Sequence, residues 1–224
     1  MSTGQFLLGL DLGTSSCKTL IIEPDGSLIS QTSASYPIYH PKISWAEENP
    51  RDWWNAVLKT IKECVKKAKA SVDEIIGLSV VSQQEAYIPL NEEGKELANG
   101  ILWIDQRTDS QLKEIKNLIP WKRVLKITGL QVYPPLVAPQ LMWIRENMPK
   151  IFEEAKYFLS PKDYINFKLT GNKTTDPSMA SRTMLFDVCK QKWAEEICET
   201  LRISVSKLPP IKEATKVAGE ITSD

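Results

Sequence analysis

Histidine is nearly absent from this chain of 224 residues, which contains only His40. HExxH zinc sites and most histidine-based metal clusters are therefore excluded. A serine-type catalytic triad would have to use His40, which lies between Tyr39 and Pro41 in a proline-bearing loop. That position does not favour a hydrolase of this kind.

Cysteine is also scarce, and the four residues form no close CxxC pair: Cys17, Cys64, Cys189 and Cys198. A reduced, cytoplasmic protein is the simplest explanation. No apolar stretch is long enough to span a bilayer. The first residues also lack the basic and apolar regions of a signal peptide, so we expect neither feature.

Neither sign of charge is in excess, because lysine plus arginine and aspartate plus glutamate both number 28. We therefore expect no binding to nucleic acid or to an anionic membrane. The composition, 42% hydrophobic and 25% charged, is ordinary for a soluble globular protein. The length allows one large domain or two small ones with a substantial core.

The most informative stretch is residues 9–18, which join two short apolar runs. Such runs, bounded by glycine and small polar residues, predict two strands connected by a tight turn. Gly13 can adopt backbone angles closed to other residues and lets a ligand approach the main chain. Successive N–H groups in a turn can bind an anion such as phosphate. Three hydroxyl groups and a cation lie beside this turn, on Thr14, Ser15, Ser16 and Lys18.

Asp11 ends the first predicted strand, where a carboxylate can hold Mg²⁺ directly or through water. The alternative is an ordinary hairpin with an exposed acidic residue. These ten residues leave both interpretations open, since short motifs match by chance. The remainder of the chain has to decide between them.

The first part of the chain predicts strands and one long helix. Strands are predicted at residues 5–12, 18–23 and 27–35, followed by a loop at 36–49. Asn49 as a cap and Pro50 at the first helical position predict an amphipathic helix that runs to about residue 68. Residues 75–81 are apolar enough for a central strand buried on both faces.

Further strands are predicted at 86–90 and 101–104, and then a helix to about residue 118. Beyond Gly129 the sequence predicts helices and loops, with an extended tail from residue 207. These helices are predicted at residues 137–147, 161–169 and 193–201. The pattern is that of an α/β protein whose architecture we expect to be incomplete in this chain.

The order strand, Asp-x-Gly-Thr-Ser-Ser turn, strand, turn, strand, helix, strand resembles the sugar kinase/Hsp70/actin ATPase superfamily. More narrowly, the chain resembles the N-terminal domain of the FGGY carbohydrate kinases, which include xylulokinase, gluconate kinase and glycerol kinase. The resemblance covers essentially the whole chain through six stretches in the same order: residues 9–18, 45–54, 101–108, 128–130, 143–147 and 180–187. It implies an α/β, ribonuclease-H-like fold with a mixed central sheet flanked by helices.

Members of this family transfer the γ-phosphoryl group of ATP to a hydroxyl of a sugar or polyol. Gln84 and Glu85 match the pair that hydrogen-bonds substrate hydroxyls, and Trp103 matches an aromatic wall of that pocket. Asp11 matches the residue that holds Mg²⁺ through water. The implied phosphate-binding residues are Gly13, Thr14, Ser15, Ser16 and Lys18.

The resemblance makes residues 1–224 the substrate- and phosphate-binding N-terminal domain of a two-domain kinase. The implied cofactors are ATP and Mg²⁺, and the implied partners are a small-molecule sugar or polyol and the missing C-terminal domain. A homodimer is left open, whereas nucleic acid and membranes are not expected as partners.

Departures from the family pattern bear on the substrate. Glycerol kinases have arginine at Gln84, and xylulokinases typically have Met-His where this chain has Gln84 and Glu85. The aromatic residue that closes the glycerol pocket falls at Pro135, and a family lysine is Gln140 here. Glycerol is therefore disfavoured, while sugars, polyols and sugar acids stay open. Because the carboxylate of Glu85 would repel an acid, we expect a neutral sugar such as a pentulose.

No catalytic base is identified in this chain. Phosphoryl transfer needs a carboxylate to accept the hydroxyl proton, and in this family it is an aspartate in a Gly-Gly-x-Asp segment after the first domain. No such segment occurs in the sequence, and Asp224 lacks the glycines. We expect Asp176 and Asp187 to be structural. The chain is therefore expected to be inactive alone, and the alternative is a non-catalytic sugar-binding or regulatory module.

Several candidate residues also have structural interpretations. Trp103 suits an apolar core as well as a pocket wall, and Glu85 and Lys18 could be ordinary exposed residues. Arg107 is expected to pair with Asp105 or to cap nearby backbone rather than to bind phosphate.

Overall fold

The computed structural model describes residues 4–132 and 136–222, and the chain forms two compact units. The first unit contains Met1–Ile38 and Asn49–Gln83, and the second contains Tyr39–Glu48 and Gln84–Asp224. The candidate phosphate turn belongs to the first unit. The candidate substrate residues belong to the second.

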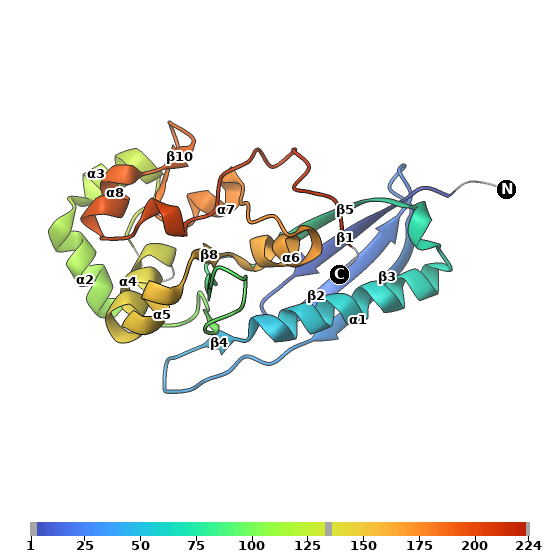
Figure 1. The fold of residues 1–224 in the computed structure, drawn as a ribbon, viewed down its shortest axis with the longest axis horizontal. Helices are drawn as coiled ribbons and strands as arrows, with labels where there is room; N and C mark the ends of the chain where they lie inside the picture. Colours follow the sequence, from blue (N-terminus) through green and yellow to red (C-terminus); the bar gives the residue numbers. More distant parts are fainter. Residues whose placement is uncertain (1–3, 133–135, 223–224) are drawn as a thin grey trace. The chain divides into compact units, whose positions relative to one another are not determined.

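A mixed four-stranded sheet forms the centre of the first unit (Figure 1). In spatial order its strands are β3 (Leu28–Ser35), β2 (Ser16–Ile22), β1 (Phe6–Leu12) and β5 (Ile75–Ser82). β2 pairs antiparallel with both β1 and β3, whereas β1 and β5 pair parallel. The three predicted N-terminal strands are thus confirmed.

Helix α1 (Pro50–Ala68) lies along this sheet (Figure 1). Its predicted start is confirmed, because the Asn49 side chain accepts a hydrogen bond from the Arg51 amide at 3.0 Å. Alternate residues of β1 and β2 are buried on the side of α1, and they are Leu8, Leu10, Leu12, Cys17, Thr19 and Ile21. The residues that alternate with these buried ones therefore lie on the opposite face of the two strands.

Hydroxyl groups join α1 to the sheet in addition to apolar packing. The Thr19 hydroxyl on β2 donates to the Thr60 hydroxyl on α1 at 2.7 Å. On β3, Thr32 donates to the Thr60 carbonyl at 2.8 Å, and Ser30 donates to the Cys64 carbonyl at 2.9 Å. Buried polar groups are costly unless they are paired, so these bonds fix one position of the helix against the strands.

Strand β5 is confirmed, but its predicted burial on both faces is wrong. Val80 is buried, whereas Ile76 and Val81 are 55% and 58% exposed. Within the described part of the chain, β5 pairs only with β1, and α1 packs against β2 and β3. Less of β5 is therefore covered than its apolar sequence suggests. A short 3₁₀ turn, η1 (Val72–Glu74), precedes it.

The second unit combines short antiparallel strand pairs with helices. The pairs are β4 (Glu47–Glu48) with β7 (Gly100–Ile101), β6 (Ile88–Leu90) with β8 (Tyr157–Leu159), and β9 (Phe186–Asp187) with β10 (Lys192–Trp193). The helices are α2 (Asp109–Leu118), α3 (Trp121–Thr128), α4 (Val137–Asn147), α5 (Pro149–Glu154), α6 (Pro161–Thr170), α7 (Pro177–Ser181) and α8 (Glu195–Thr200). The 3₁₀ turn η2 (Val205–Lys207) precedes a tail without regular structure.

The predicted helix at 137–147 is confirmed at both ends, and the helix predicted at 161–169 extends to Thr170. The helix predicted at 193–201 begins later, because Lys192–Trp193 pairs with β9. The strand predicted at 101–104 is reduced to β7, since residues 103 and 104 form a turn. Helices α3, α5 and α7 are not predicted from the sequence, because segments of eight residues or fewer show little periodicity.

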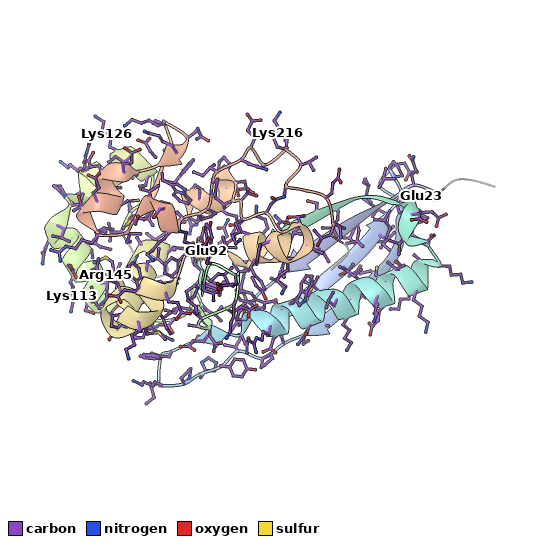
Figure 2. The ribbon with its side chains drawn as sticks, in the orientation of Figure 1. Glu23, Glu92, Lys113, Lys126, Arg145 and Lys216 are labelled. Atoms are coloured by element: carbon purple, nitrogen blue, oxygen red, sulfur yellow. The ribbon has the colours of Figure 1, made fainter. Side chains whose placement is uncertain are left out.

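The core of the second unit gathers around α4, in which every residue from 137 to 144 is buried. This helix packs against α2 and α5. Charged side chains such as Lys113 on α2 and Lys126 on α3 lie on the outer surface (Figure 2). Of the described helices, none combines the length and the apolar character that a membrane span requires.

All four cysteines are free thiols. Cys17, Cys64 and Cys198 are buried, and Cys189 is exposed in the turn between β9 and β10. Burial raises the pKa of the Cys198 thiol to about 12. The expectation of reduced cysteines agrees with this arrangement.

Arg107 connects three segments of the second unit. It donates to Glu47 at 2.8 Å through Nη1, and to Asp105 at 2.7 and 2.9 Å through Nη2 and Nε. Its guanidinium carbon lies 3.7 Å from the ring centre of Trp45 and 4.9 Å from that of Trp143. The Arg107 side chain is only 2% exposed. The predicted pairing of Arg107 with Asp105 is confirmed.

Replacing Arg107 with methionine (R107M) should lower the free energy of unfolding by about 3–5 kcal/mol, because it leaves buried carboxylates uncompensated. The matched control is K156M, whose half-exposed pair with Glu92 should contribute about 0–1 kcal/mol. Urea unfolding followed by tryptophan fluorescence measures both changes. Equal losses in the two variants would contradict the role assigned to Arg107.

Candidate functional site

The turn between β1 and β2 is held by hydrogen bonds from two sides. Within the turn, the Gly13 amide donates to the Ser16 carbonyl at 3.0 Å. Tyr36, which follows β3, donates its amide to the Ser15 carbonyl at 3.2 Å and its hydroxyl to the Gly13 carbonyl. The Gly13 amide is therefore engaged inside the turn. Hydrogen bonds within the protein therefore fix the main chain of this turn.

Gly13 does not use the conformational freedom that the sequence suggests. Its φ angle is not in the positive region, unlike that of Gly26 at 92°. A Cβ atom at Gly13 would meet the Ser16 carbonyl oxygen at 3.4 Å, an ordinary contact. The prediction of special backbone angles is wrong. The remaining reason for glycine is that it lets a ligand approach the main chain closely.

Asp11 and Lys18 are cross-strand partners on β1 and β2, and both are exposed. They alternate with the residues buried under α1, so they lie on the other face of the sheet. Ser15 is exposed in the adjoining turn, and Thr14 and Ser16 are half-buried. Asp11 and Lys18 line a hollow of about 220 Å³ together with Gly9, Leu10, Thr19, Leu20, Gln31, Ser79 and Val81.

Asp11 fits a magnesium ion that is shared with a nucleotide. In residues 4–132 and 136–222, no three histidine, cysteine, aspartate or glutamate side chains gather as a metal-binding group. Mg²⁺ usually keeps several waters and is bound by one or two carboxylates plus substrate phosphates. A single exposed carboxylate beside the turn suits that arrangement and does not suit a resident protein-ligated metal.

Glu85 is held at three points in the second unit. Its φ angle is 57°, a left-handed conformation that is uncommon for residues other than glycine. Its Oε1 atom accepts a hydrogen bond from Nε of Arg182 at 2.9 Å and forms an ion pair with Nη2 of the same residue at 2.7 Å. Its backbone carbonyl accepts one from Nε2 of Gln140 at 2.9 Å. Glu85 is buried, so the alternative of an ordinary exposed carboxylate is wrong.

The charge of Glu85 is compensated inside the protein. Burial raises the pKa of Glu85, and hydrogen bonding and the positive charge of Arg182 oppose that rise. The repulsion of an acidic substrate, on which the expectation of a neutral sugar rests, is therefore weaker than the sequence alone suggests.

Gln84 is half-buried next to Glu85, and Trp103 lies in the turn after β7. Trp103 is 46% exposed, so the alternative that it belongs to the core is wrong. A tryptophan that is partly exposed can cover one side of a ligand.

Arg182 and Gln140 are the contacts that sequence reasoning misses as partners of Glu85. Arg182 lies 97 residues and Gln140 lies 55 residues from Glu85 along the chain. No local pattern connects such distant positions. The only general signal is that a buried carboxylate requires a cation or donors nearby.

A group of carboxyls lies around Tyr87. Burial raises the pKa of Tyr87, and the charges of Asp163, Asp176 and Glu85 raise it further. Asp163 is fully buried on α6, and burial raises its pKa to about 6 although the positive charge of Lys162 opposes this. Lys162 forms ion pairs with both Asp163 and Asp176.

Asp176 and Asp187 are structural, as predicted. The Asp176 carboxylate caps α7 by accepting from the amides of Ser178 and Met179 at 2.8 and 3.1 Å. The Asp187 carboxylate accepts from the amides of Cys189 and Lys190 at 3.1 and 3.0 Å.

Three other positions are named in the sequence analysis: His40, Pro135 and Asp224. His40 is exposed, with its Nδ1 atom 2.8 Å from the Trp45 carbonyl oxygen. Pro135 and Asp224 lie outside the described residues.

The mixed sheet, its crossover helix and the hydroxyl-bearing turn are those of a ribonuclease-H-like fold. The family described as "FGGY family of carbohydrate kinases, N-terminal domain" matches residues 6–224. The chain belongs to this family.

Relatives that are named for different substrates have similar sequence identities to this chain. The xylulose kinase of Bacillus subtilis (strain 168) is 31% identical over 217 residues, which are 97% of this chain and 43% of that protein. The glycerol kinase of Thermococcus onnurineus (strain NA1) is 32% identical over 220 residues, 96% of this chain and 44% of that protein.

Solved structures confirm the fold. The crystal structure of gluconate kinase from Lactobacillus acidophilus has a TM-score of 0.91 at 28% sequence identity, covering 98% of this chain and 44% of that one. The chain thus spans less than half the length of the relatives it matches.

Replacing Gly13 with alanine (G13A) should leave the free energy of unfolding within about 0.5 kcal/mol of the wild type, since no positive φ is disturbed. The added methyl group should nevertheless weaken ATP binding several-fold, because it occupies the space next to the main chain. Thermal unfolding and calorimetric titration of the whole protein with ATP measure the two effects.

The matched control is G26A, which forces alanine into a positive φ angle and should cost about 1 kcal/mol without changing ATP binding. A destabilised G13A variant with unchanged ATP affinity would show that Gly13 serves the fold only.

Replacing Asp163 with asparagine (D163N) should stabilise the protein at pH 7.5 and should do so less at pH 5. Burial favours the protonated carboxyl in the folded state, so wild-type stability falls as the pH rises through about 6. The rise in pKa from 3.8 to about 6 limits the gain to about 3 kcal/mol. Denaturant unfolding at the two pH values measures it, and destabilisation at both would mean that the ionised Asp163 is needed by Lys162.

Proposed function

We propose that the whole protein containing this chain transfers the γ-phosphoryl group of ATP to a hydroxyl of a sugar or polyol, with a neutral pentulose favoured. The observation that carries the proposal is the match of residues 6–224 to the carbohydrate kinase family, together with the fixed turn after β1. The xylulose kinases among the relatives, 31–32% identical, support the pentulose.

Phosphoryl transfer depends mainly on positioning and on charge stabilisation. In the proposed site, the turn residues Gly13, Thr14, Ser15 and Ser16 bind the phosphates of ATP, and Lys18 contributes a positive charge. Asp11 holds Mg²⁺ through water, and this ion neutralises phosphate charge when it is bound. The support is the exposure of Asp11, Ser15 and Lys18 beside a turn whose main chain is already fixed.

The sugar is held by the second unit. Gln84 and Glu85 bind its hydroxyl groups, and Trp103 covers one side of it. The support is that Glu85 is buried and forms an ion pair with Arg182, whereas Trp103 is partly exposed. Because the charge of Glu85 is compensated, the preference for a neutral sugar depends on the relatives more than on repulsion.

The general base lies outside this chain in our proposal, in a C-terminal domain that follows it. Two observations support this. The sequence contains no Gly-Gly-x-Asp segment, and the chain covers only 43–44% of the length of its relatives. Residues 1–224 alone are then inactive. We also propose a cytoplasmic location, which the free thiols support, and a homodimer stays a prediction.

The test is a coupled ADP-release assay of the whole protein against ketopentoses, aldoses, polyols, glycerol and gluconate. We expect the highest kcat/KM for a neutral pentulose and no activity of the isolated 224-residue chain. Lack of activity toward every compound would favour the non-catalytic sugar-binding module. Activity of the isolated chain would show that its base lies within residues 1–224.

A further inference from the structure

The ion pair between Glu85 and Arg182 has an uneven geometry. Two nitrogen atoms of Arg182, Nε and Nη2, contact the same carboxylate oxygen of Glu85, Oε1, at 2.9 and 2.7 Å. The Glu85 side chain is 9% exposed, whereas that of Arg182 is 35% exposed. A carboxylate has two oxygens with about four acceptor positions, so this arrangement uses one oxygen and fixes the direction of the other.

The backbone of Glu85 is fixed together with its side chain. The φ angle of 57° gives a conformation that persists only where the surroundings enforce it. The buried amide of Gln140 provides such a contact through its bond to the Glu85 carbonyl. Orientation of the carboxylate is thus determined from both ends.

Arg182 is itself placed by the end of α7. Its amide donates to the Met179 carbonyl at 3.3 Å, at the C-terminal cap of this helix. Asp176 caps the other end, and Lys162 on α6 pairs with Asp176. These contacts hold the backbone at Arg182 and at the start of α7.

We propose that Arg182 is a positioning residue that orients Glu85 so that the second carboxylate oxygen, Oε2, accepts a hydroxyl of the sugar. The inference rests on the proposed function and deepens it. Arg182 acts through Glu85 and does not touch the sugar hydroxyl itself. Loss of Arg182 should therefore weaken the sugar site specifically, with no direct effect on ATP.

The positioning role of Arg182 should change how kcat/KM depends on pH, because Arg182 affects the pKa of Glu85. Burial raises the pKa of Glu85 and Arg182 opposes the rise. The negative charges of two other acidic groups, Asp163 and Asp176, raise the pKa of Tyr87. Without Arg182, the pKa of Glu85 should increase, so the acidic limb of the pH profile should move to higher pH.

The experiment compares R182M, R182K, E85Q and the double variant E85Q/R182M in the whole protein, with the best sugar from the assay above. R123M is the matched control, because Arg123 pairs with Glu196 on the surface of the same unit. Circular dichroism and thermal unfolding establish that each variant is folded. R182K keeps the charge and one donor, so it remains informative where R182M does not fold.

A hydrogen bond to a charged group contributes about 1.5–3 kcal/mol, which corresponds to a loss of about 10- to 150-fold in kcat/KM. We expect R182M and E85Q each to show a loss in this range, mainly through the KM of the sugar, with the KM of ATP unchanged. R182K should lie between R182M and the wild type, and R123M should match the wild type. In the E85Q background, R182M should add less than about twofold, because the two residues act as one unit.

Fully multiplicative losses in E85Q/R182M would overturn the inference, as would an unshifted pH profile in R182M or an equal rise in both KM values. If the wild type is active and the variants give such results, only the role of Arg182 is contradicted. If the wild type is inactive, both the proposed function and this inference are contradicted.

Discussion

The buried guanidinium group of Arg107 is the connection on which the second unit depends. It forms ion pairs with Glu47 on β4 and with Asp105 after β7. It also stacks on the rings of Trp45 and Trp143. Asp105 also accepts from the Ala46 amide at 2.6 Å, so the network fixes main chain as well as side chains. A planar arginine can stack and donate in a fork, which lysine cannot do. Residues 45–47 and 105–107, far apart in sequence, therefore meet in one polar centre of the second unit.

The first unit achieves rigidity in another way, through hydroxyl groups. Thr60 on α1 bonds to Thr19 and Thr32 on two neighbouring strands. Tyr36 then fastens the turn after β1 at the carbonyl groups of Gly13 and Ser15. Satisfied polar groups inside a core specify a unique arrangement. In each unit, the residues proposed to bind a ligand are held by contacts within the protein: the turn by Tyr36, and Glu85 by Arg182 and Gln140.

Local signals in the sequence were sufficient for much of the fold. The cap at Asn49, the short apolar runs of β1 and β2 and the apolar residues of α4 are local features, so the positions of these elements could be predicted. The exposure of Val81 and Trp103 could not be predicted, because it depends on what packs against them. The position of the turn between β1 and β2 was predicted correctly, but its hydrogen bonds to Tyr36 and the pairing of Glu85 with Arg182 are long-range contacts. Periodicity carries no information about such contacts.

The unequal burial of the four thiols has a practical consequence. Cys17, Cys64 and Cys198 are enclosed, and burial raises the pKa of Cys17 and Cys198, which keeps these sulfurs protonated and unreactive. Cys189, in the turn between β9 and β10, is open to solvent. A maleimide dye or spin label would consequently attach at one position of this chain without any engineering. The label would report spectroscopically on the second unit while the sheet of the first stays untouched.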